Sequence, residues 1–197
     1  MTTDTSKSSS HLIKDLKSIP SPMFYIFSAV AVFAGFYVKG FTVSGILCTL
    51  FLLLLVACAA ADLNKGIVPD FIVILIAVLG IVKFLLTEQI SVNSALPYLI
   101  GAICVSVPML LLSLILKGAF GGGDIKLAAA AGLFLGWKFT LSGMVIGLFA
   151  SGLYGIYLII RKKAGPKSKL RIAPFLSYGL AAAALFGELL IRLLFGW

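Results

Sequence analysis

Long apolar runs alternate with short polar breaks along most of this 197-residue chain. Runs of about 20 apolar residues are long enough to cross a lipid bilayer as α-helices. The pattern therefore predicts an all-α membrane protein, a polytopic bundle of about seven transmembrane helices. The predicted segments are Met23–Val38, Val43–Ala61, Ile67–Leu86, Leu96–Leu116, Ile125–Trp137, Phe139–Ile160 and Ile172–Phe195.

The fifth segment, Ile125–Trp137, is the shortest, and it makes the number of crossings six or seven. A helix of about 13 residues rises about 20 Å, which is less than a hydrocarbon core of about 30 Å. Either the helix begins below the membrane surface, or the segment is re-entrant. Both arrangements place Asp124, which directly precedes the segment, within the membrane profile in a water-accessible notch.

The first 20 residues differ from the rest, because they are polar and rich in Ser, Thr and Lys. Such a composition cannot bury enough apolar surface to form a packed core. We expect residues 1–20 to be a polar cytoplasmic tail and residues 21–197 to be a single transmembrane domain.

The basic residues predict the orientation of the chain in the membrane. There are 16 Lys and Arg against seven Asp and Glu, and the formal net charge is +9. With the N-terminus inside, 12 of the 16 basic residues fall on the cytoplasmic side, six of them in the loop Arg161–Arg171. Cytoplasmic loops carry such an excess, so we predict an N-in, C-out topology in the cell membrane. The positive charge is attributed to an anionic lipid surface, and no nucleic-acid partner is expected.

Cysteine and histidine offer no pattern for a metal site. Cys48, Cys58 and Cys104 all lie inside apolar runs without CxxC spacing, and the single histidine, His11, lies in the polar tail. We interpret the cysteines as small buried apolar residues. Neither a metal nor another cofactor is expected.

Two carboxylates are placed where a structural role does not readily explain them. Asp62 ends the second segment and Asp124 precedes the fifth, so two crossings separate them and both lie at the cytoplasmic edge. A close pair of carboxylates cannot ionise fully without a large electrostatic cost, so the two share one proton. One can then take a proton from water while the other protonates a scissile peptide bond.

Structural explanations compete with this one. Asp124 follows glycines and precedes a helix, so it could be an N-cap. Asp62 is harder to explain, because a negative charge opposes the dipole at the C-terminal end of a helix. Asp70 follows Pro69 at a helix start, where acidic residues are ordinary, so it is structural or at most supports the pair or a basic substrate.

The residues around Asp124 also allow two interpretations. Gly121, Gly122 and Gly123 could form a flexible turn, or a bare edge along which an extended substrate backbone could lie. Lys126 could anchor the chain on the cytoplasmic side, or it could favour ionisation of the carboxylate pair. We regard these four residues and Asp70 as candidates for binding substrate or supporting the pair.

The two acidic segments together resemble a known family. The stretch GGGDIK at Gly121–Lys126 resembles the GxGDxK motif of type IV prepilin peptidases and archaeal preflagellin peptidases. The stretch DLNKGIVPD at Asp62–Asp70 resembles the first catalytic segment of that family, with Val68 before the proline as a minor departure. The helix at Leu127–Trp137 and the segment Arg171–Gly179 are also similar to family segments.

This resemblance implies a membrane aspartic endopeptidase with Asp62 and Asp124 as its catalytic pair. Its partner would be a prepilin-like or preflagellin-like precursor, whose short basic leader is cut at a small residue on the cytoplasmic side. Longer members of the family carry CxxC motifs and also methylate the new N-terminus. This chain has no CxxC, so neither methyl transfer nor zinc is expected.

Two other functions remain open at this point. In a small ion- or proton-coupled transporter, the two carboxylates would form a relay beside a discontinuous fifth helix. No inverted repeat is apparent, however, and both acids lie at one edge rather than at the midplane. The third possibility is a non-catalytic membrane scaffold for filament assembly.

Overall fold

The computed structural model describes residues 21–87, 91–116, 120–161 and 172–196. Every regular element in these ranges is helical, which confirms the predicted fold class. The predicted tail, residues 1–20, lies outside the described residues. The helices are α2 (Ser21–Lys39), α3 (Val43–Lys65), α4 (Asp70–Thr87), α5 (Val92–Cys104), α6 (Ser106–Ile115), α7 (Gly122–Leu135), α8 (Trp137–Ile160) and α9 (Ala173–Phe195).

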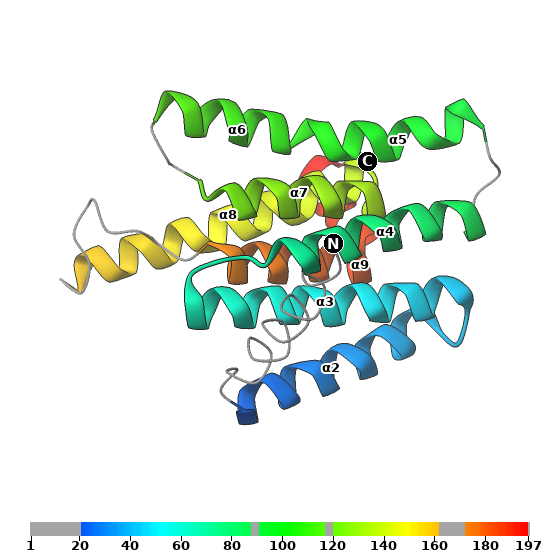
Figure 1. Ribbon diagram of the computed structural model, residues 1–197, viewed down its shortest axis with the longest axis horizontal. Helices are drawn as coiled ribbons and strands as arrows, with labels where there is room; N and C mark the ends of the chain where they lie inside the picture. Colours follow the sequence, from blue (N-terminus) through cyan, green and yellow to red (C-terminus); the bar gives the residue numbers. More distant parts are fainter. Residues whose placement is uncertain (1–20, 88–90, 117–119, 162–171, 197) are drawn as a thin grey trace, which may run out of the picture.

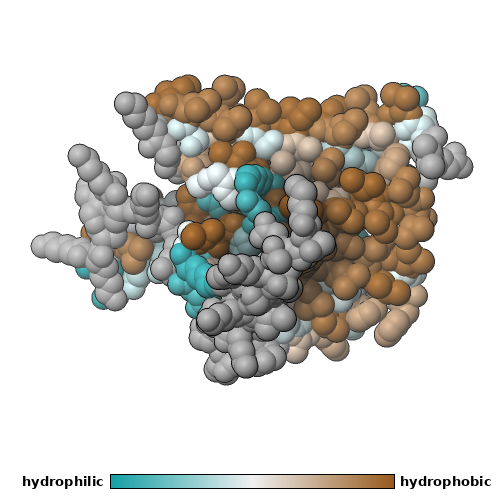
Figure 2. Space-filling view, in the orientation of Figure 1, coloured by the Kyte–Doolittle hydropathy of each residue, from teal (hydrophilic) through white to brown (hydrophobic). Residues whose placement is uncertain are grey.

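Five stretches of the described chain are long and apolar enough to cross a membrane: Val43–Lys65, Asp70–Thr87, Val92–Ile115, Trp137–Ile160 and Ala173–Leu194. The protein is therefore a multi-pass helical membrane protein. Figure 1 shows its helices running side by side along one long axis. On the face shown in Figure 2, apolar residues cover most of the surface, as expected for a protein that meets lipid tails.

Helix boundaries differ from the predicted segments where proline or glycine acts on the backbone. The fourth segment is divided into α5 and α6 at Val105. Pro108 explains the break, because it cannot donate to the carbonyl of Cys104 and its ring would clash there. The second segment continues past its predicted end to Lys65, where Gly66 closes the helix at φ 65° and donates to the carbonyl of Asp62 at 2.8 Å. Asp62 therefore lies within the last turn of α3.

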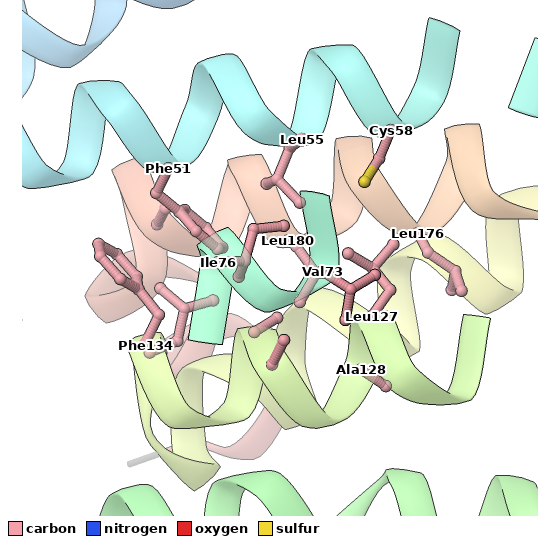
Figure 3. Packing of buried hydrophobic residues seen from close by; sticks show 14 of the residues in the cluster. Phe51, Leu55, Cys58, Val73, Ile76, Leu127, Ala128, Phe134, Leu176 and Leu180 are labelled. Atoms are coloured by element: carbon pink, nitrogen blue, oxygen red, sulfur yellow. The ribbon is translucent and has the colours of Figure 1, made fainter. Parts of the chain in front are cut away.

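The core lies between α3, α4, α7 and α9 (Figure 3). Phe51 of α3 stacks on Phe134 of α7, with ring centroids 4.2 Å apart and planes 7° from parallel. Ile76 of α4 and Leu180 of α9 are fully buried beside them. Stacked aromatic rings contribute stability beyond that from the burial of two large side chains. This contact joins the two helices that carry the candidate carboxylates.

Small residues let several helices approach until their backbones touch. A methyl group on Gly143 of α8 would lie 2.8 Å from the carbonyl oxygen of Gly179 in α9. A methyl group on Gly101 of α5 would lie 2.6 Å from the carbonyl oxygen of Gly132 in α7. Close packing of this kind is how membrane helices associate where water supplies no hydrophobic driving force.

We expect Gly143→Ala to destabilise the protein, because its methyl group has no room against α9. Overpacking of this kind costs about 1–3 kcal/mol. Gly152→Ala in the same helix is the matched control, since nothing lies within 4 Å of its added methyl group, and alanine there favours the helix by about 1 kcal/mol. Thermal unfolding in detergent measures both. A Gly143→Ala protein as stable as the Gly152→Ala protein would contradict the described crossing of α8 and α9.

Candidate active site

Asp62 is buried at the end of α3. Only 6 % of its surface is exposed, and Cys58, one turn earlier on the same helix face, is completely buried. A carboxylate at a helix C-terminus faces the negative end of the helix dipole. The fold therefore places this acid where its charged form is disfavoured both by burial and by its own helix.

Asp124 is buried in the first turn of α7, where 8 % of its surface is exposed. The N-cap of this helix is Gly121, not Asp124, so the interpretation of Asp124 as the N-cap is wrong in detail. The carboxylate instead lies beside Gly121, whose backbone N–H favours its charged form. The first turn is also where the helix dipole favours a negative charge.

The structure brings the two acids together. The end of α3 and the start of α7 lie at the same end of the bundle (Figure 1), and the charge of Asp62 acts on Asp124. Both carboxylates also act electrostatically on the thiol of Cys58, which lies one turn before Asp62. The helix dipoles act with opposite sign on the two acids, which makes the two members of the pair electrostatically different.

The three glycines before Asp124 differ in their surroundings. A methyl group on Gly123 would lie 2.8 Å from Cβ of Val68, so the first turn of α7 packs tightly on the connection between α3 and α4. A methyl group on Gly121 would lie 3.0 Å from Oδ2 of Asp124, whereas nothing lies within 4 Å at Gly122. Gly123 thus has a packing role that the sequence analysis did not foresee, and Gly122 has an open side.

Lys126 and Asp70 form an ion pair that joins α7 to the start of α4. The Nζ and Oδ1 atoms are 2.7 Å apart, and the two side chains are 57 % and 66 % exposed. Sequence analysis placed both residues at the same edge but did not pair them, because their 56-residue separation carries no contact signal. Asp70 is therefore engaged with Lys126, which lowers its availability to a basic substrate.

Beside Asp62, an apolar groove of about 270 Å³ runs between α2, α3 and α9. It ends at Leu63 and Asn64, the two residues that follow Asp62. The Oγ atom of Ser177 and the Nδ2 atom of Asn64 are buried there without a hydrogen-bond partner among the described residues. Sequence analysis did not identify Asn64 or Ser177, since single polar residues in apolar runs gave no pattern to detect.

No group of three or more His, Cys, Asp or Glu side chains that could hold a metal ion occurs within the described ranges. The arrangement that is present, two buried acids on neighbouring helix ends, can exchange a proton with a bound water and with a peptide group. Such an exchange is the chemistry that metal-free hydrolysis requires.

The Asp70–Lys126 pair makes a testable contribution to stability. Either Asp70→Lys or Lys126→Asp alone places like charges together. Each should lower the free energy of unfolding by about 0.2–1 kcal/mol, because an exposed ion pair contributes no more than this to stability. The double exchange, Asp70→Lys with Lys126→Asp, should recover most of the loss. Chemical denaturation at low and high salt measures the four proteins. A double variant as unstable as the sum of the single variants would show that the side chains do not interact.

Comparison with known proteins identifies a family for this arrangement. The model of the type IV leader peptidase family matches residues 48–160, more than half of the chain and a range that contains both acids. The chain is 27 % identical over 143 residues to a prepilin leader peptidase/N-methyltransferase of Bacillus subtilis, covering 72 % of this chain and 56 % of the relative. It is 30 % identical over 144 residues to a protein of the same description from Burkholderia pseudomallei, covering 72 % of this chain and 47 % of the relative.

A similar protein from Aeromonas salmonicida is 26 % identical over 140 residues, covering 70 % of this chain and 48 % of the relative. The chain thus spans about half the length of the curated relatives it matches. No solved structure matches it closely.

Proposed function

Because the chain belongs to the type IV leader peptidase family, we propose that it is a membrane aspartic endopeptidase that removes the short basic leader of prepilin-like or preflagellin-like precursors. The observation that carries this proposal is the juxtaposition of Asp62 and Asp124, two buried acids brought together from α3 and α7. Both lie within the family-matched range, and each lies in a segment that resembles a catalytic segment of that family.

In the proposed reaction, the ionised member of the pair removes a proton from a bound water. The water oxygen attacks the carbonyl carbon of the scissile peptide bond, while the protonated member donates to the carbonyl oxygen. Collapse of the tetrahedral intermediate transfers a proton to the leaving nitrogen. A pair in unlike surroundings suits this division of roles, because one acid must hold the proton while the other is ionised.

The side of the membrane follows from the charges. The end of the bundle where α3 ends and α4 and α7 begin is also where α8 ends (Figure 1). In the sequence, α8 is followed by the predicted cytoplasmic loop Arg161–Arg171. We therefore place the site at the cytoplasmic face of the cell membrane. A site at one end of the bundle also favours a peptidase over a transporter, whose ion sites lie near the midplane.

Replacing either acid by asparagine should abolish cleavage. We expect Asp62→Asn and Asp124→Asn each to lower kcat by about 10³-fold or more, since each removes a proton-transfer group. The assay uses purified protein in detergent and a precursor with a basic leader, and Glu188→Gln, at an exposed acid of α9, is the matched control. Cleavage should also survive EDTA.

Three results would contradict this mechanism. These are cleavage by either variant at the rate of the wild-type protein, loss of cleavage in EDTA, and no cleavage by the wild-type protein across a panel of leaders. The second would indicate a metal, and the third would favour transport or a scaffolding role.

The apolar groove beside Asp62 suits the hydrophobic segment that follows the cut. Ala60 lines this groove, so Ala60→Trp should obstruct it and raise KM about tenfold for a precursor that carries the apolar segment. A soluble peptide that ends shortly after the cleavage site is the control, and its cleavage should not change. Equal effects on both substrates would show that the groove does not receive the apolar segment.

A further inference from the structure

Lys83 lies in the apolar part of α4, far along that helix from the carboxylates. Thirteen residues separate it from Asp70, a rise of about 20 Å. A charged side chain within a membrane segment is costly, so it requires a specific partner. The structure places Lys83 within α4, half-buried and turned toward α7.

The ammonium group of Lys83 caps the C-terminal end of α7. Its Nζ atom donates to the carbonyl oxygen of Phe134 at 2.8 Å, and it lies 4.7 Å from the centre of the Phe134 ring and 5.6 Å from that of Tyr98. The last four carbonyls of a helix lack partners within the helix, and the helix dipole is negative at this end. A lysine four residues from the end of α4 could extend to the membrane surface, yet this one turns to α7.

Two further contacts fix α7 against α4. At the end near the carboxylates, Lys126 pairs with Asp70 at 2.7 Å. Near Lys83, a methyl group on Gly80 would lie 2.8 Å from the backbone of Leu133, so the two helices touch there without intervening side chains. α7 therefore has little freedom to slide along α4. An ion pair holds it at one end, and a backbone contact and a charged hydrogen bond hold it at the other.

Asp124 depends on this fixation, because it is carried by the same short helix. Ten residues, about 15 Å of helix, separate it from Phe134. Asp62 is carried by α3, so its separation from Asp124 is set by how α7 sits in the bundle. A movement of α7 along its axis would change that separation directly.

We infer that Lys83 is a positioning residue, which holds α7 in register with α4 and thereby sets the distance between Asp124 and Asp62. Its effect on cleavage rests on the proposed peptidase function, whereas its effect on the geometry of the pair does not. A displacement of about 1 Å can cost a reaction about 100-fold in rate. Removing Lys83 should therefore affect the chemical step more than the binding of substrate.

The first arm of the test is kinetic and compares Lys83→Met, Lys83→Arg and the control Lys138→Met in the full-length protein. Lys138 is an exposed lysine at the start of α8, near the same end of the bundle. We expect Lys83→Met to lower kcat by about 10- to 100-fold with KM within about twofold. Lys83→Arg keeps a cationic donor and should stay within about threefold of wild type, as should Lys138→Met.

The second arm measures geometry without any substrate. Spin labels at Leu63→Cys and Gly122→Cys, in a background with the three native cysteines replaced by alanine, report the distance between the end of α3 and the start of α7. Leu63 is exposed and Gly122 has open space around it. Lys83→Met should shift or broaden the distance distribution, and Lys83→Arg should not. If the methionine variant does not fold, Lys83→Gln replaces it, with the same direction of change expected.

A lowered kcat with an altered distance distribution, both rescued by arginine, would support the inference. An unchanged distribution in Lys83→Met overturns it, whatever happens to kcat, because Lys83 would then not position the helix. If the wild-type protein cleaves no precursor, the proposed function fails, but the distance measurement still decides whether Lys83 sets the geometry of the pair.

Discussion

The structure depends on holding α7, a helix too short to span a bilayer, inside a bundle of longer ones. At 14 residues it rises about 21 Å, and the ends of α6 and α8 extend past its start (Figure 1). Such a helix cannot be anchored by lipid at both ends, so neighbouring helices must hold it. The stacking of Phe134 on Phe51 joins it to α3, and Gly132 brings it into backbone contact with α5. Its contacts with α4 complete the support.

A short helix held by its neighbours can carry a carboxylate that is both shielded from water and accessible to it. A carboxylate that must exchange protons with water needs access to the aqueous phase, but a carboxylate whose protonation is to be tuned must be shielded from it. The helix begins at Gly122, short of the ends of α6 and α8 (Figure 1), and this places Asp124 in its first turn, largely buried but near one end of the bundle. The same arrangement brings it to Asp62 at the end of α3.

The two acids do not contribute equally to stability. Asp124 lies in the first turn of its helix, where the helix dipole and the backbone N–H of Gly121 favour its charge. Asp62 lies at the wrong end of its helix for a negative charge and is slightly more buried than Asp124. This unfavourable placement is consistent with the catalytic role proposed for Asp62, because functional sites often oppose stability. This asymmetry makes Asp62 the stronger indicator of function, although the glycine-rich motif at Asp124 is the more conspicuous sequence.

The sequence by itself determined the membrane class and most of the helical segments, because these depend on local composition. It also predicted that α3 ends and α7 begins at the same end of the bundle, because this depends on the parity of the membrane crossings. It also indicated that α7 is short. It did not determine the pairing of Lys126 with Asp70, the packing of Gly123 on Val68 or the turn of Lys83 toward Phe134. Those contacts join residues about 50 positions apart, and apolar periodicity carries no information about which helices become neighbours. Only the tertiary structure decided them, since helix packing in a bilayer depends on close shape complementarity rather than on burial of apolar surface from water.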